Sequence, residues 1–172
     1  MADWQKIVSQ HSGSVWQTAY RLLGRADEAA DCFQETFLAA LKVSGRQKVR
    51  NWPALLSRVC TCRAMDRLRK RLREGERSKS LGDWSNVASP NPGPIEVLQG
   101  EELSAGLRRA LARLPEQQGE VFCMRCLNDM SYREIAKQLG LKGSAVGVLL
   151  HRARRRLREL LSEKIGPEDA ET

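Results

Sequence analysis

The chain has 172 residues, of which 41% are hydrophobic and 29% charged, which is enough for one domain or two small ones. A net charge of +8 favours a polyanionic partner, and nucleic acid fits better than a membrane because no apolar run approaches spanning length. The first residues resemble no export signal, so we expect a cytoplasmic protein whose five cysteines are reduced.

The first predicted element is a helix over residues 3–23, where apolar side chains repeat at helical spacing. The polar run around Gly13 predicts a weak point in its middle, and Gly24 predicts its end. A second helix is predicted over residues 25–42. Its apolar stripe consists of Ala30, Phe33, Phe37, Ala40 and Leu41.

The second predicted helix is acidic in a basic protein. Its acids are Asp27, Glu28, Asp31 and Glu35, with no basic residue between Asp27 and Leu41. Acids in the first turn suit the helix dipole, so one interpretation is an ordinary solvated face. The other interpretation is a docking surface for a basic partner.

A third helix is predicted from residue 51 onward, with Pro53 at its first position. Its inward face is predicted to consist of Leu55, Leu56, Val59, Cys60, Met65, Leu68 and Leu72. Between residues 63 and 79 its cations outnumber its acids by eight to three. Such a run is compatible with a soluble helix end, but a second basic cluster further along the chain favours contacts with backbone phosphates.

Helical periodicity stops over residues 75–94, where Ser, Asn, Gly and Pro predict a linker. Trp84 is unusual in a solvated linker and indicates an anchor on one of the domains or on a partner. Periodicity resumes over residues 95–114, and a further helix is predicted over residues 116–129 after Pro115.

Residues 131–158 carry the most specific pattern. Ser131 and Glu134 form a capping box, and Gly140 predicts the end of a short helix. Ser144 is predicted to cap a second helix with Val146, Leu150, Ala153 and Leu157 on one face. Two amphipathic helices joined at a glycine also occur in proteins that do not bind DNA. Five arginines within seven residues favour a DNA-binding helix-turn-helix. They are Arg152, Arg154, Arg155, Arg156 and Arg158.

These elements predict an all-α protein of two small helical domains, because no strand pattern of useful length occurs. The expected domains are residues 1–74 and residues 95–165, joined by the linker 75–94, with a disordered tail over residues 166–172. No convergent acids, nucleophile or metal constellation indicates an enzyme, so we expect no catalytic activity, no cofactor and no metal. The four cysteines of residues 60–62 and 123–126 could hold zinc only if the domains brought them together, and buried small hydrophobes are the commoner role.

Together, residues 19–41, 52–73 and 110–141 resemble the extracytoplasmic-function type of bacterial RNA polymerase sigma factor. The resemblance implies a promoter-specificity subunit that binds core RNA polymerase, including the β′ clamp helices and the β subunit. It implies contacts with duplex and single-stranded promoter DNA and leaves room for an anti-sigma factor. The acidic D-x-x-Q-E segment implies docking on the clamp helices by Asp31, Gln34, Glu35 and Leu38.

The resemblance implies two DNA-binding sets. The third helix would help to melt the minus-10 element and hold the melted strand through Arg58, Arg63, Arg67, Arg69, Lys70, Arg71 and Arg73. The helix-turn-helix would contact the minus-35 element through Tyr132, Arg133, Lys142, Ser144, Ala145, Gly147, Val148, His151, Arg152, Arg154 and Arg155.

Several residues depart from the family's pattern. The reading helix usually begins G-T-V-K-S-R-L, but here Ala145, Gly147, Val148 and Leu149 replace the Thr, Lys, Ser and Arg. Without those donors, we expect binding by DNA shape and backbone, with methyl groups available to thymine and weak minus-35 discrimination. The opposing interpretation is that Arg152 or Lys142 reads a guanine. In the third helix, Cys62 and Leu55 replace a usual Asn and a usual aromatic, so strand capture is expected to differ.

Other functions stay open on the sequence alone. A one-component helix-turn-helix regulator would need a sensor domain, for which the first 74 residues look too small and too basic. A recombinase or transposase would need catalytic residues that are not evident. A decoy that binds polymerase without initiating transcription is compatible with the altered reading helix.

Overall fold

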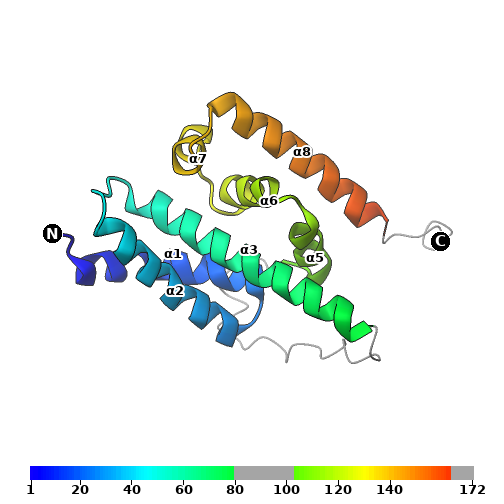
Figure 1. The fold of residues 1–172 in the computed structure, drawn as a ribbon, viewed down its shortest axis with the longest axis horizontal. Coiled ribbons are helices and arrows are strands. Elements are labelled where there is room, and N and C mark those ends of the chain that lie inside the picture. The colour runs from blue at the N-terminus through cyan, green and yellow to red at the C-terminus, as the bar shows by residue number, and fades with distance from the viewer. Residues whose placement is uncertain (80–102, 164–172) are drawn as a thin grey trace. The chain divides into compact units, whose positions relative to one another are not determined.

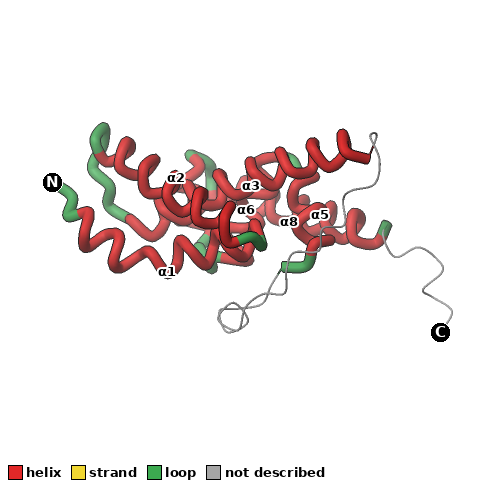
Figure 2. The backbone as a smooth tube through the Cα atoms, turned by 90° about the horizontal axis from the view of Figure 1, so that it is seen from below, coloured by secondary structure: helices red, strands yellow, loops and turns green. Residues whose placement is uncertain are grey.

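The computed structural model describes residues 1–79 and 103–163, and within these ranges every regular element is a helix (Figure 2). The elements are α1 Trp4–Leu23, α2 Ala26–Ser44, α3 Trp52–Lys79, α5 Ala105–Arg113, α6 Glu116–Phe122, the π-helix η1 Cys123–Leu127, α7 Tyr132–Leu139 and α8 Gly143–Ser162. They form two compact helical units, which confirms the predicted fold class, and the units divide between Leu103 and Ser104. Residues 80–102, with Trp84, and the tail lie outside the described residues.

In the first unit, α1, α2 and α3 each pack against the other two (Figure 1). Helix α1 begins at Asp3, whose Oδ1 accepts a hydrogen bond from the Lys6 N–H at 3.2 Å, and it ends at Gly24 with a φ of 67°. The predicted single helix is confirmed, and α1 continues through Gly13 without a break. A mid-helix glycine costs about 1 kcal/mol, which the packing of buried Ile7 and Val15 on either side offsets.

Helix α3 is the longest element of the first unit. It is capped by Asn51, whose Oδ1 accepts from the Ala54 N–H at 3.0 Å, so Pro53 occupies the second helical position and not the first. Helix α3 also continues to Lys79, past the expected domain boundary at residue 74. Its buried side chains supply much of this unit's core, including Leu56, Cys60, Ala64, Met65 and Leu68.

In the second unit, α5, α6 and α7 all pack against α8. The single helix predicted over residues 116–129 is divided, since α6 passes into the π-helix η1 at Cys123. There the Asn128 N–H donates to the Cys123 carbonyl at 3.2 Å, a spacing of five residues. Hydrophobic periodicity does not distinguish an α turn from a π turn, so the sequence could not reveal this change.

Candidate functional site

The exposed face of α2 carries acidic and amide groups together with large apolar side chains. Asp31, Gln34 and Leu38 are exposed at helical spacing, and Leu38 is 58% exposed. Leu41 extends this face and is 45% exposed, so this member of the predicted apolar stripe is not part of the buried side of α2. The sequence could have indicated this exposure, because Leu41 follows Leu38 by three residues and lies on the same side of the helix as Asp31 and Gln34. We call Asp31, Gln34, Leu38 and Leu41 the α2 surface.

Glu35 differs from its neighbours because it is joined to α3. Its carboxylate lies 2.7 Å from Arg67 Nη2 and 3.8 Å from Arg63 Nη1. The structure therefore brings one residue of the predicted polymerase-docking set together with two of the predicted minus-10 set. Glu35 therefore contributes to the packing of α2 on α3. Replacing it with a basic residue would place three cations close together.

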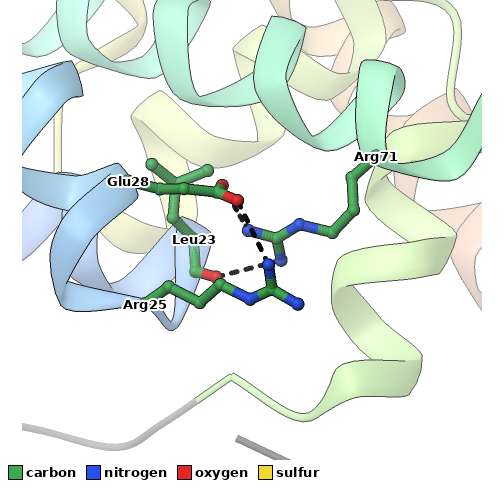
Figure 3. Close-up of polar contacts among 4 residues, drawn as sticks. All are labelled: Leu23, Arg25, Glu28 and Arg71. Carbon is green, nitrogen blue, oxygen red and sulfur yellow. Dashed lines mark hydrogen bonds and ion pairs between the residues drawn. The ribbon is translucent and has the colours of Figure 1, made fainter. Parts of the chain in front are cut away.

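Arg71 links all three helices of the first unit (Figure 3). Its Nη1 donates to the Leu23 carbonyl at 3.0 Å, at the end of α1, and its Nη2 pairs with Glu28 Oε2 at 2.5 Å, in the first turn of α2. Glu28 also pairs with Arg25 at 3.4 Å. Arg71 was predicted to contact DNA, but in this structure its guanidinium holds the turn between α1 and α2.

The remaining predicted cations of α3 have different surroundings. Arg69 pairs with Asp66 at 3.2 Å, and Arg58 is half-buried. Arg63, Lys70 and Arg73 are exposed. The predicted minus-10 set is therefore not one surface, since Arg67 and Arg71 turn toward acids of α2 while Lys70 and Arg73 face solvent.

The helix-turn-helix of the second unit begins with the predicted capping box. The Ser131 hydroxyl accepts from the Glu134 N–H at 3.1 Å, and the Glu134 carboxylate accepts from the Ser131 N–H at 2.9 Å. Gly140 adopts a left-handed φ of 65°, which ends α7. Helix α8 begins at Gly143 after Lys142, so the prediction that Ser144 caps it is wrong.

Helix α8 separates a buried face from an exposed one. The predicted inward residues Val146, Leu150, Ala153 and Leu157 are all buried. The exposed side carries Ser144, Val148, His151, Arg152 and Arg155, while Ala145 and Gly147 are half-buried at its edges. Arg133 of α7 and Lys142 are exposed as well. Arg154 is exposed and lies 3.8 Å from the Cys126 sulfur.

Tyr132 opens α7, and its ring contacts Arg125 and lies near Gly147. The Arg125 guanidinium lies over its ring at 5.6 Å from the centroid, and Arg125 also donates to the Met130 carbonyl at 3.2 Å. A Cβ added at Gly147 would lie 3.7 Å from the ring. Arg125 therefore connects η1 to the start of the helix-turn-helix, a contact that the spacing of residues in the sequence does not reveal.

Buried thiols lie between the helices of the first unit. The Cys32 thiol donates to the Cys60 carbonyl at 3.8 Å, and the Cys60 thiol donates to the Val15 carbonyl at 3.6 Å. A hydrogen bond with Cys32 and burial raise the pKa of Cys60 well above its usual value. Within residues 1–79 and 103–163, no three side chains of the metal-binding types gather closely enough to hold a metal ion. No helix in the described ranges has the length and apolar character needed to cross a membrane.

A helix-turn-helix unit with a basic second helix, preceded by a separate three-helix unit, defines a class of two-domain helix-turn-helix proteins. Residues 7–74 match the family profile described as Sigma-70 region 2, and residues 104–157 match Sigma-70, region 4. The ECF RNA polymerase sigma factor EcfG of Rhodopseudomonas palustris is 33% identical over 156 residues, which cover 88% of this chain and 83% of EcfG. This chain therefore belongs to the ECF RNA polymerase sigma factors.

Other relatives agree with this assignment. SigE of Mycolicibacterium smegmatis is 31% identical over 95% of this chain, which spans only 63% of SigE. SigW of Bacillus subtilis is 26% identical, over 91% of this chain and 88% of SigW. The fold is similar to that of the sigma factor RpoE of Bartonella quintana, solved in complex with the anti-sigma factor NepR. That similarity has a TM-score of 0.59 and 22% identity and covers 94% of this chain and 98% of RpoE.

Proposed function

We propose that this chain binds core RNA polymerase and directs it to specific promoters, where it helps to open the DNA. The observation that carries the proposal is that this family member has two chemically different exposed surfaces, one on each unit. The α2 surface combines the exposed acid Asp31 with exposed leucines, and the exposed face of α8 combines cations with small side chains. The first suits a protein partner with basic and apolar groups, and the second suits a duplex.

Each unit has its own role in this proposal. The first unit, with the expected domain of residues 1–74, docks on the β′ clamp helices through the α2 surface. It follows the melted minus-10 strand through the exposed cations Arg63, Lys70 and Arg73. The second unit, with the expected domain of residues 95–165, holds the minus-35 duplex, and the chain between α3 and α5 joins the two. The β subunit is the further contact on polymerase.

This role needs no active site in the chain, because the polymerase supplies the catalytic chemistry. We place the protein in the cytoplasm, where polymerase and promoters are. An anti-sigma factor is a further proposed partner, since the similar RpoE was solved with one. Leu38 and Leu41 are the exposed apolar groups on which such a partner would compete with polymerase.

A polymerase-binding decoy is the second candidate function, and a specific observation favours it. The first turns of α8 offer no long hydrogen-bond donor on their exposed face, where base edges are usually read. A decoy would still bind core polymerase through the α2 surface. It would not start transcripts.

Transcription by purified core polymerase decides between the two functions. Genomic fragments are incubated with core polymerase and the full chain, and new 5′ ends are sequenced. We expect initiation at a small set of shared promoters only when the chain is present. Polymerase binding without new transcripts would support the decoy, and DNA binding without polymerase binding would support a one-component regulator.

A further inference from the structure

The centre of the exposed face of α8 is apolar. Val148 is 49% exposed and lies opposite the buried Val146, Leu150 and Ala153. Tyr132 is 42% exposed, and among residues 104–163 these two are the exposed large hydrophobic side chains. A single exposed valine is ordinary in a soluble protein. Val148 is different because it lies on the reading helix, within reach of the position where base edges would pass.

The residues about one turn before Val148 on the exposed face of α8 are small and uncharged, whereas His151 and Arg152 follow it by about one turn. Ser144 precedes it by about one turn of helix, and Ala145 and Gly147 lie on either side. Gly147 leaves room beside the Tyr132 ring, from which an added Cβ would be separated by 3.7 Å. This patch, made of Tyr132, Ser144, Ala145, Gly147 and Val148, can approach a groove floor closely. Apart from the hydroxyls of Tyr132 and Ser144 it has no donor, and none that is forked and could pair bidentately with a guanine or an adenine.

The rim of the patch is positively charged. Lys142 lies before it, Arg133 is on α7, and Arg152 and Arg155 come later on the exposed face of α8. These side chains are exposed, and their charge is complementary to the two phosphate backbones that border a major groove. The charged rim therefore indicates that the partner of the apolar patch is duplex DNA and not an apolar protein surface.

From these observations we infer that Val148 reads thymine in the upstream promoter element through its C5 methyl group, an inference that rests on the function proposed above. In the major groove, the thymine methyl is the only apolar group that a base pair presents. Guanine, cytosine and adenine would instead place donors or acceptors against Val148. Those polar groups would lose water without gaining a partner. The patch thus selects an A·T pair with its thymine facing α8.

A methyl deletion in the DNA isolates this contact. Holoenzyme made from the full chain and core polymerase selects from a pool of promoter fragments with randomised upstream and minus-10 windows. Each enriched upstream thymine is then replaced by deoxyuridine, which lacks only the methyl group. We expect weaker binding by about fourfold at the thymine that faces Val148, the equivalent of about 0.8 kcal/mol for one buried apolar carbon.

The matching protein change is Val148→Ala. It should reduce the ratio between thymine and deoxyuridine binding to near one at that position, since the partner of the methyl is gone. Val8→Ala is the control, because Val8 of α1 is another exposed valine, 37% exposed, and lies outside the second unit. This variant should keep the fourfold ratio.

Each outcome decides the inference. Equal binding of thymine and deoxyuridine at every enriched position would overturn it, as would a fourfold ratio that persists in Val148→Ala. Transcription by the holoenzyme without enrichment of any upstream thymine would overturn it and leave the proposed function standing. Failure to form a transcribing holoenzyme would instead overturn the proposed function, and with it the inference.

Discussion

Replacing Arg71 should lower the stability of the first unit, although the basic run in which it lies suggests a DNA-binding residue. Arg71→Met removes one hydrogen bond to the Leu23 carbonyl and one charge-assisted bond to Glu28. Hydrogen bonds to charged groups contribute about 1.5–3 kcal/mol when buried. The two side chains are 31% and 25% exposed, so solvent screening lowers the value. We expect a loss of about 2 kcal/mol.

Chemical denaturation of the full chain, monitored by a helical signal, measures this loss. A double-mutant cycle with Glu28→Gln should give a coupling of about 1 kcal/mol, because each single change already breaks the shared ion pair. A variant Arg71→Met within about 0.5 kcal/mol of the wild type would refute the reasoning, since that is the range of surface substitutions without a structural role.

Lys70 is the matched comparison, because it is adjacent in sequence but exposed on α3. Lys70→Met should change stability by less than about 0.5 kcal/mol and lower the log–log salt slope of open-complex formation by about one. An unchanged slope would remove Lys70 from the path of the DNA.

Three further outcomes are expected from the same structure. Asp31→Lys combined with Leu38→Ala should weaken core polymerase binding by about tenfold or more in a pull-down titration without lowering stability, since both side chains are exposed on the α2 surface. Gly147→Ala should stabilise the protein to denaturant by about 1 kcal/mol, whereas Gly140→Ala, at a φ of 65°, should destabilise it by a similar amount. Peptide mapping after brief alkylation should find Cys126 labelled before the buried cysteines, and equal labelling would contradict the burial pattern.

Hydrophobic spacing was sufficient to predict most helices and the buried face of α8. Val146 and Leu150 recur at the helical period, so their burial needs only the helix and one partner surface. The capping box at Ser131 is local as well, and its geometry agrees with the prediction. These features depend on residues a few positions apart, which a sequence displays directly.

The partners of charged side chains could not be predicted in the same way. Whether Arg67 meets DNA or Glu35 depends on how α3 packs on α2, a relation between residues that are far apart in the chain. Composition shows only that cations are abundant. The exposure of Leu41, by contrast, could have been inferred, because Leu41 lies on the same side of the helix as Asp31 and Gln34.

The π turn at η1 has a consequence for insertions and deletions. A π turn contains about one residue more than an α turn, so removing one residue there can restore an ordinary helix without rotating α7 and α8. Removing one residue from within α7 or α8 would rotate all later side chains of that helix by about 100° and move its apolar face into solvent. Exposed Cys126 is the position whose loss the second unit should tolerate. Variation in chain length among natural sequences of this unit is therefore expected to concentrate at η1.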